Sequence, residues 1–405
     1  MAQILFSRGG LCYTKTYIYE IISEGIRMKV LCFGSLNIDM VYAVPHFVRG
    51  GETLAAHGLA RYTGGKGLNQ AVALARAGAS VRMAGAIGED GRFLLDALSA
   101  AGADTALVEV RPDTPTGHAI IQNDAAGDNC ILLYGGANRT ITQQQIRRTV
   151  AAFAPGDAIL LQNEVNGLSD LFRAAADAGQ RIFFNPSPME ADLLDLPLGL
   201  VDTFFLNEGE AAALTGLPAS ATEEELPSAL ARRFPRANIV LTLGGKGARY
   251  LAGGQCLAQP AYAVPVVDTT GAGDTFTGFF LAAVAEGQSP AAAMDLASRA
   301  AAIAVSRPGA APSIPTRAEA EAFRGGRGCF ALCCSTWTTR FWTFARRSMR
   351  RFEGHLQACP SRRAKRCLRA IASSMGSIGS GSSAARSRAQ SSRRRAFGSF
   401  SGSSA

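Results

Sequence analysis

The residues best suited to chemistry form the string Asp268-Thr269-Thr270-Gly271-Ala272-Gly273-Asp274-Thr275-Phe276, which precedes an apolar stretch with helical periodicity. A glycine-rich turn entering a helix exposes backbone N–H groups at the positive end of the helix dipole. The amides of Gly271, Ala272 and Gly273 can therefore stabilise negative charge on a transferred phosphoryl group. Asp274 closes the turn, where its carboxylate can accept the proton of an attacking hydroxyl group. The string predicts a site of phosphoryl transfer.

A second glycine-rich string, Gly64-Gly65-Lys66-Gly67-Leu68-Asn69-Gln70, begins another predicted helix far upstream. Its glycines let the backbone approach a ligand, while Lys66 and Asn69 can donate hydrogen bonds to hydroxyl groups. Asn37 and Asp39 follow the first predicted strand, and open α/β sheets bind ligands at such strand ends. Together these residues predict a binding site for a polyhydroxy substrate.

Short apolar runs alternate with segments of helical periodicity along most of the chain. This pattern is typical of an α/β fold in which helices cover both faces of a mainly parallel sheet. Buried strands are predicted at 29–34, 81–84, 158–162, 182–185, 203–206 and 239–242. Helices are predicted at 68–77, 93–101, 168–178 and 272–286.

Residues 40–62 and 117–134 depart from this pattern, because they alternate apolar and polar residues. They contain the turn sequences Arg49-Gly50-Gly51 and Ala126-Gly127-Asp128. We expect antiparallel hairpins that form a small β-sheet outside the main sheet. Such a sheet could close over a substrate as a lid, and its outer face could pair with a second subunit in a homodimer. The alternative is a pair of surface hairpins without a lid role.

The charge of the chain is distributed unevenly. The 405 residues are 47% hydrophobic and 18% charged, which suits a protein with a sizeable core, and the net charge is +9. Residues 325–405 contain 16 Lys and Arg but one acidic residue, so this segment carries +15 and the first 324 residues carry −6. The basic character therefore gives no reason to expect a nucleic-acid partner for the main domain.

Three regions are predicted along the chain. Residues 1–27 are an N-terminal extension upstream of Met28, consistent with a misassigned start codon. Residues 28–324 form the catalytic domain. Residues 325–405 are a basic low-complexity tail that we expect to be disordered, because stretches such as 373–383 contain too little apolar material to fold.

The remaining patterns favour a cytoplasmic enzyme. The cysteines of the first 324 residues are scattered, as in reduced cytosolic proteins. Charged residues interrupt the first 27 residues, which argues against a signal peptide. No window approaches the roughly 18 consecutive apolar residues of a membrane span. The chain also lacks a Gly-x4-Gly-Lys-Ser/Thr loop, so ATP phosphates would be bound by a different type of loop.

Both glycine-rich strings, in this order, resemble the two signature regions of the ribokinase-like carbohydrate kinase family. The likeness runs from 28 to 322. It includes Asn207-Glu208-Gly209-Glu210, similar to the family's Asn-x-x-Glu motif, and 242–247, which resembles its nucleotide-binding turn. Residues 304–313 are similar to its cation loop. The resemblance implies a ribokinase-like three-layer α/β fold with a small β-sheet lid.

The resemblance also implies a role for each matching residue. The sugar would contact Asn37, Asp39, Gly65, Lys66, Asn69, Glu164 and the base Asp274. The nucleotide would contact Asn207, Thr242, Gly244, Gly247, Gly273 and Ser298. Glu210 would help to position Mg²⁺ through water. An activating monovalent cation, K⁺, would be coordinated by Asp268, Thr270, Ala304, Arg307, Gly309 and Ser313.

The implied reaction transfers a phosphoryl group from ATP to the primary hydroxyl of a sugar, with D-ribose converted to D-ribose 5-phosphate as the expected case. Deoxyribose, fructose or a nucleoside are alternative acceptors, and the segments around Leu68 and Glu164 would set the preference. The alternative outside the enzymes is a non-catalytic regulator that binds a sugar and uses the basic tail to bind nucleic acid. Asp274 argues against it, because a binder has no need of a base.

Overall fold

The computed structural model describes residues 28–124 and 128–327. The predicted N-terminal extension lies outside the described residues, as does the predicted tail apart from its first three residues. Two of these, Gly326–Arg327, form a short strand (β15) that pairs with Tyr262–Ala263 (β14). In the described part of the chain, no helix combines the length and apolarity needed to cross a membrane.

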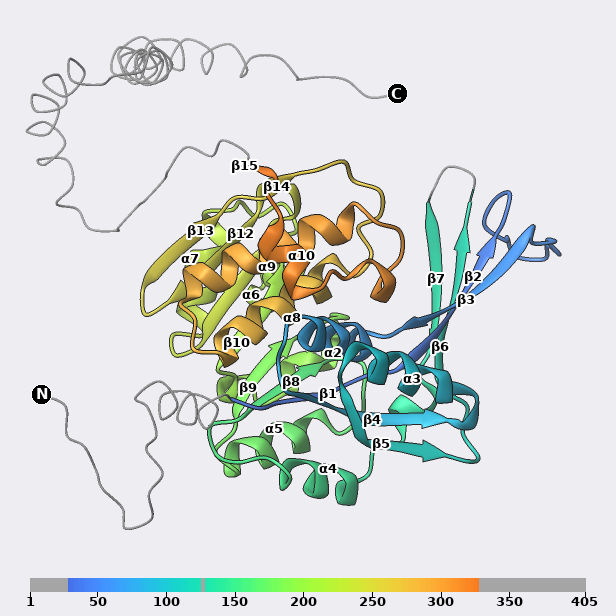
Figure 1. The fold of residues 1–405 in the computed structure, drawn as a ribbon, viewed down its shortest axis with the longest axis horizontal. Helices are drawn as coiled ribbons and strands as arrows, with labels where there is room; N and C mark the ends of the chain where they lie inside the picture. Colours follow the sequence, from blue (N-terminus) through green and yellow to red (C-terminus); the bar gives the residue numbers. More distant parts are fainter. Residues whose placement is uncertain (1–27, 125–127, 328–405) are drawn as a thin grey trace, which may run out of the picture. The chain divides into compact units, whose positions relative to one another are not determined.

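The large sheet has nine strands in the order β13-β12-β11-β10-β9-β8-β1-β4-β5 (Figure 1). The seven strands from β11 to β5 are parallel, and β12 and β13 form an antiparallel extension. The mainly parallel sheet predicted from the sequence is therefore confirmed. The strands are β1 (Val30–Phe33), β4 (Val81–Gly88), β5 (Asp104–Arg111), β8 (Ala158–Gln162), β9 (Arg181–Asn185), β10 (Thr203–Asn207), β11 (Asn238–Thr242), β12 (Ala248–Ala252) and β13 (Gln255–Gln259).

Helices cover both faces of this sheet and make it the middle of three layers (Figure 1). Successive side chains of a strand point to opposite faces. In β8, Leu160 packs into one core cluster and Leu161 into the other. One cluster contains α2 (Lys66–Arg76), α3 (Arg92–Ala101), α8 (Ala272–Ala285), α9 (Pro290–Val305) and α10 (Arg317–Ala322). The other contains α4 (Gln143–Val150), α5 (Leu168–Asp177), α6 (Glu208–Thr215) and α7 (Glu225–Arg233).

The chain reverses its direction of travel across the sheet between β1 and β8. From β1 it proceeds to β4 and β5 on one side, then returns to β8 on the other side of β1 and continues to β11. The connections that leave two neighbouring strands in opposite directions open a crevice at their carboxyl ends. This crevice is the expected position of a ligand site.

A separate sheet of four strands, in the order β3-β2-β6-β7, contains the two predicted hairpins. Each hairpin is antiparallel, and a parallel pairing of β2 with β6 joins them. The first hairpin is longer than predicted, because it starts at Asn37 and ends at Gly64. The strands are β2 (Asn37–Ala43), β3 (Gly58–Gly64), β6 (Gly117–Asn123) and β7 (Asn129–Tyr134).

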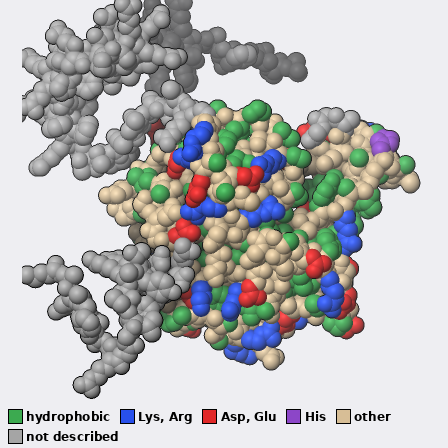
Figure 2. Space-filling view, in the orientation of Figure 1, with side chains coloured by type: hydrophobic (Ala, Val, Ile, Leu, Met, Phe, Trp, Pro, Cys, Tyr) green, Lys and Arg blue, Asp and Glu red, His purple; other side chains and the backbone are tan. Residues whose placement is uncertain are grey.

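The small sheet exposes several large apolar side chains. Leu59, Ile131, Leu132 and Leu133 are each more than half exposed. Hydrophobic side chains are visible on this sheet at the upper right of Figure 2. Pairing of the sheet with a second subunit stays a prediction.

Helices α2 and α8 pack at very short range. A Cβ atom on Gly278 of α8 would lie 2.4 Å from Ala73 Cβ and 2.8 Å from Leu74 N, both in α2. Only glycine allows this approach without displacement of the helices. The contact therefore fixes the separation of the two helices. Helix α2 begins in the predicted sugar-binding string, and α8 begins in the predicted phosphoryl-transfer string.

Gly278→Ala is expected to lower the free energy of unfolding, because the added methyl group overlaps α2. Overpacking costs about 1–3 kcal/mol, which exceeds the roughly 0.5–1 kcal/mol that alanine gains over glycine within a helix. Thermal unfolding monitored by circular dichroism measures the effect. Gly199→Ala is the matched control, because a Cβ atom there meets nothing within 4 Å. Equal melting temperatures for the two variants would contradict the close contact.

Candidate active site

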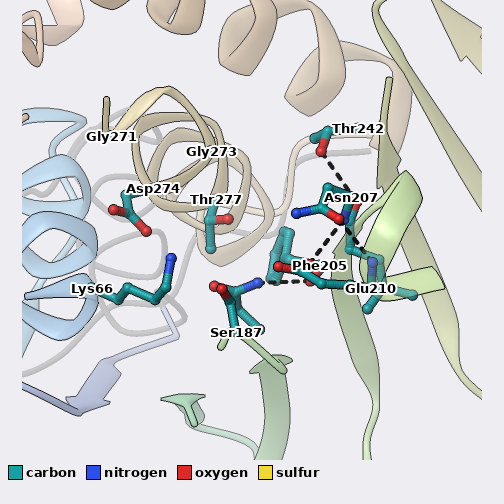
Figure 3. Close-up of a pocket in the computed structure, with 12 residues that line it drawn as sticks. Lys66, Ser187, Phe205, Asn207, Glu210, Thr242, Gly271, Gly273, Asp274 and Thr277 are labelled. Atoms are coloured by element: carbon teal, nitrogen blue, oxygen red, sulfur yellow. Dashed lines mark hydrogen bonds between the residues drawn. The ribbon is translucent and has the colours of Figure 1, made fainter. Parts of the chain in front are cut away.

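Two adjoining cavities lie where the carboxyl ends of the parallel strands meet the start of α8. The smaller cavity, of about 230 Å³, is lined by Lys66, Asp274 and Glu210 among others (Figure 3). The larger, of about 600 Å³, is lined mainly by apolar groups and extends between the 242–247 turn and α9. Asn207, Thr242 and Gly273 line both cavities, so the two spaces adjoin.

The Asp274 side chain lies in the first turn of α8 and is 8% exposed. The Asn69 amide nitrogen donates to Asp274 Oδ2 at 3.1 Å, and the Gln70 amide nitrogen donates to Oδ1 at 2.9 Å. Both donors come from α2. The two N–H groups therefore hold both oxygens of the carboxylate in a fixed orientation.

Lys66 lies opposite Asp274, and Figure 3 shows its side chain pointing into the smaller cavity toward that carboxylate. Burial alone would lower the pKa of the Lys66 ammonium group. The negative charges of Asp274, Glu164 and Glu210 outweigh burial and leave this pKa raised. Lys66 therefore carries a positive charge at neutral pH in a cavity with three acidic neighbours.

The other predicted sugar-binding residues surround the start of α2. Glu164 Oε2 accepts hydrogen bonds from the Ser35 hydroxyl and, at 3.1 Å, from Lys66 N. A Cβ atom on Gly65 would lie 2.9 Å from Asn37 N, so the turn is pressed against the start of β2. Segments from three parts of the chain thus meet here.

The predicted sugar-binding residues Asn37, Asp39, Gly65, Asn69 and Glu164 form what we call the sugar cluster. Two of its features suit a sugar. Burial and the charge of Glu164 raise the pKa of Asp39 to about 6, so Asp39 is an ionised acceptor at neutral pH. Asn69 Oδ1 is buried and has no hydrogen-bond partner among the described residues. Buried polar atoms are almost always paired in native proteins. A substrate hydroxyl group is a suitable donor for Asn69 Oδ1.

Leu68 does not reach this cluster. Its side chain is fully buried within the core formed by α2, α8 and the sheet. The expectation that Leu68 helps to set acceptor preference therefore has no support from its position, since the side chain packs away from both cavities.

The larger cavity contains the predicted nucleotide-binding residues. Gly244 and Gly247 line it from the turn after β11, and Ser298 lines it from α9. Thr242 is the last residue of β11, and its hydroxyl group donates to Leu206 O at 3.1 Å. The volume and the apolar lining suit a planar base and its ribose.

Asn207 and Glu210 form a capping box at the start of α6. The Asn207 side chain accepts from Glu210 N at 2.8 Å, and Glu210 Oε2 accepts from Asn207 N at 3.0 Å. Burial raises the pKa of Glu210. No cluster of three or more His, Cys, Asp or Glu side chains suitable for a metal occurs in the described ranges. A single carboxylate beside the phosphate region fits Mg²⁺ that keeps most of its water ligands.

The turn before α8 has the geometry of an anion cradle. Gly271 caps the helix with φ of 72°, and Gly273 lines both cavities. The Ala272 N–H donates to Thr269 O at 3.2 Å and is therefore partly occupied. The Gly273 N–H is not paired with an acceptor in the part of the chain described. Of the three predicted residues, Gly271 lines the smaller cavity, Ala272 lines the larger one, and Gly273 lines both.

The predicted cation-binding residues lie on two adjacent segments. Asp268 accepts from Thr270 N and from Gly309 N, both at 2.8 Å, which ties the cradle turn to the segment after α9. Asp268 N also donates to Val305 O at 3.2 Å. Ala304 and Arg307 are joined by a backbone hydrogen bond at the end of α9, and the Ser313 hydroxyl donates to Ala310 O. The available ligand atoms are oxygens, which suit K⁺.

Several polar residues of the site were not identified from the sequence. They are Ser35, Gln70, Asn138, Gln162, Asn185, Ser187 and Thr277. Gln162 and Asn185 end β8 and β9, so the position of strand ends could have revealed them. Gln70 directly follows Asn69, but nothing in the sequence shows which side of α2 it occupies.

Comparisons with known proteins agree with this geometry. A profile of the pfkB family of carbohydrate kinases matches residues 27–317. Ribokinase of Haemophilus influenzae is 35% identical over 303 residues, which cover 74% of this chain and 99% of the relative. The deoxyribokinase of Salmonella typhi is 33% identical and covers 71% of this chain and 96% of the relative.

The fold of a ribokinase from Arabidopsis thaliana, solved with ribose and ATP, is also similar. Its TM-score is 0.65 at 30% identity, and the match covers 73% of this chain and 97% of that protein. By sequence and by structure, this chain belongs to the pfkB family of carbohydrate kinases.

Proposed function

We propose that this kinase transfers the terminal phosphoryl group of ATP to the primary hydroxyl group of D-ribose. The observation that carries the proposal is the buried Asp274 carboxylate, which receives two amide donors and borders a small polar cavity that adjoins a larger one. The similarity to ribokinases, including one with bound ribose and ATP, supports the choice of ribose and ATP.

Asp274 acts as the general base of the reaction. Its carboxylate accepts the proton of the ribose hydroxyl as that oxygen attacks the terminal phosphorus of ATP. The bond from this phosphorus to the bridging oxygen breaks, and the electron pair leaves with ADP. The products are ribose 5-phosphate, ADP and the proton held by Asp274.

Lys66 and the Gly273 amide stabilise the transferred group. Lys66 supplies a full positive charge from one side of the smaller cavity, and the start of α8 supplies an N–H group at its positive end. Donors that are fixed in place before the reaction cost no reorganisation when charge develops. Asn37, Asp39, Gly65, Asn69 and Glu164 hold the sugar so that one hydroxyl group faces Asp274.

Two cations complete the proposed site. Glu210 would help to hold Mg²⁺ through water, and the ion would supply positive charge to the ATP phosphates. The residues that would hold K⁺ beside the turn that precedes α8 are Asp268, Thr270, Ala304, Arg307, Gly309 and Ser313. The Asp268 bridge between the turn and Gly309 supports this assignment, because the bridge links the cation segment to the anion cradle.

Deoxyribose is the acceptor most closely related to ribose, and a deoxyribokinase is among the similar proteins. Ribose differs from deoxyribose by one hydroxyl group. A site with buried polar groups that pair with that hydroxyl discriminates strongly against the analogue that lacks it. The ionised Asp39 and the unpaired Asn69 Oδ1 favour the sugar with the larger number of hydroxyl groups.

We also propose that the small sheet mediates a homodimer. The strand pairing places the exposed side chains of Leu59 and Leu132 on the same face of the sheet, and exposed apolar side chains that share a face are unusual for a sheet open to water. β7, at the edge of this sheet, is exposed along its whole length. Burial of this surface against a second copy would remove both features.

Asp274→Ala is expected to lower kcat for ribose-dependent ADP release about 10²–10⁴-fold, the usual contribution of a general base. Ribose affinity, measured by calorimetry, should change little, because the remaining sugar contacts stay in place. Asp202→Ala is the control, since Asp202 pairs with Arg181 at the opposite end of β10. Unchanged turnover in Asp274→Ala would refute the assigned role.

The rate of the wild-type enzyme at saturating Mg²⁺ is expected to be severalfold higher in K⁺ than in Na⁺. Asp268→Asn should abolish this difference, because the variant loses the negative charge of the proposed site. A full titration of both salts at constant ionic strength provides the measurement. Equal rates in the two salts across the titration would count against the cation site.

A further inference from the structure

Gln70 is a buried polar residue that lines neither cavity. No role for it was predicted from the sequence. Its side chain has no exposed surface. The amide nitrogen donates to Asp274 Oδ1 at 2.9 Å and to Asn185 Oδ1 at 3.2 Å. The amide oxygen accepts from Gln162 Nε2 at 2.7 Å. Every polar atom of the Gln70 side chain is thus paired within the protein.

The direction of this chain of amides is set by the backbone. The Asn185 nitrogen donates to Phe205 O at 3.0 Å, and a carbonyl oxygen can only accept. The other atom of the Asn185 amide, its oxygen, therefore faces Gln70 and requires a donor there. The Gln70 nitrogen supplies that donor, and its second hydrogen reaches Asp274. A reversed Gln70 amide would place an oxygen against two acceptor oxygens.

We propose that Gln70 is a positioning residue, which orients the Asp274 carboxylate and keeps it ready to accept the proton of the sugar hydroxyl. This inference rests on the proposed role of Asp274 as the base. Asn69 holds the other carboxylate oxygen, but it also belongs to the sugar cluster and has an unpaired oxygen. Gln70 has no exposed surface and does not belong to the sugar cluster as Asn69 does, and Asp274 is the one ionisable group to which it donates.

Other charged and titratable groups surround Asp274, and a pH measurement must take account of them. Lys66 of α2 attracts the carboxylate, whereas Glu164 after β8 and Glu210 of α6 repel it. Cys32 of β1 is fully buried, and burial raises the pKa of its thiol to about 12, so it remains neutral. None of these residues is altered in the variants below.

Two variants separate positioning from simple packing. Gln70→Met keeps most of the side-chain volume but removes the donor. Gln70→Glu keeps the shape, yet its ionised form cannot donate and places a like charge beside Asp274. If Gln70 only fills space, Gln70→Met should lower the melting temperature and keep the wild-type pH profile of kcat. If Gln70 positions Asp274, the acidic limb of that profile should move in Gln70→Met and move further in Gln70→Glu.

The experiment measures kcat for ribose-dependent ADP release between pH 5 and pH 9, with ATP and ribose saturating. In Gln70→Met, kcat at pH 7 should fall about tenfold because the carboxylate is no longer held in its orientation. The acidic limb of the profile should also move to higher pH, because loss of a donor favours the protonated carboxylate. The limb should move further in Gln70→Glu. The KM for ribose should change little in both.

Gln180→Met controls for the loss of a buried amide. Gln180 is buried, and its nitrogen donates to the carbonyl groups of Val150 and Phe153. The melting temperature of Gln180→Met should fall as in Gln70→Met, while the pH profile of kcat in Gln180→Met should match the wild type. A wild-type profile in Gln70→Met, or an equal loss of kcat at every pH, would overturn the inference.

Asp274→Ala, assayed in parallel, separates this inference from the function on which it depends. If Asp274→Ala retains turnover, the proposed base itself is wrong. If Asp274→Ala is inactive and Gln70→Met has the wild-type profile, Asp274 remains the base and only the positioning role of Gln70 is refuted.

Discussion

Helices α2 and α8 touch where Gly278 faces Ala73 and Leu74, and the site depends on this contact. Asp274 begins α8, while its two hydrogen-bond donors, Asn69 and Gln70, lie in α2. Hydrogen bonds of about 3 Å between two helices require a fixed separation, because they weaken steeply with poor geometry. The small residues at the crossing provide that separation. Gly278 lies one helical turn after Asp274, so the packing at Gly278 holds the proposed base in position.

The parallel sheet supplies the second half of the site through the ends of its strands. Strands β8, β9, β10 and β11 are largely apolar within the sheet, and each finishes in a polar residue. These residues are Gln162, Asn185, Asn207 and Thr242. The register places Gln162 beside Asn185 and Asn207 beside Thr242. One end of a hydrophobic sheet therefore carries a row of hydrogen-bonding groups that extends from the proposed sugar-binding residues to the proposed nucleotide cavity.

The features that follow from local sequence were predictable. Apolar runs located β8 at 158–162, and the glycine-rich turn located the start of α8 at Ala272. Both glycine-rich strings entered helices at the carboxyl edge of the sheet, as expected. The antiparallel strands β12 and β13 and the helices α6, α7 and α9 were not identified. Their apolar patterns are short or interrupted, and their stability comes from contact with the rest of the sheet.

The network behind Asp274 could not be predicted, because its contacts join distant parts of the chain. The bond from Gln70 to Asp274 links residues 204 positions apart, and the bond from Gln162 to Gln70 links residues 92 positions apart. A glutamine in a helix reveals neither its burial nor its partner from sequence. The position of Leu68 was equally undetermined, since its neighbours Lys66 and Asn69 reach the site while Leu68 packs into the core.

The central claim is that the site aligns the primary hydroxyl of ribose with Asp274. The most direct measurement is the initial rate of ADP release by the full chain with ATP, Mg²⁺ and K⁺, across D-ribose, deoxyribose, fructose and a nucleoside. We predict the highest kcat/KM for D-ribose. A higher kcat/KM for any of the other acceptors would contradict the assignment of ribose, and an absence of ADP release with every acceptor would contradict the kinase mechanism itself.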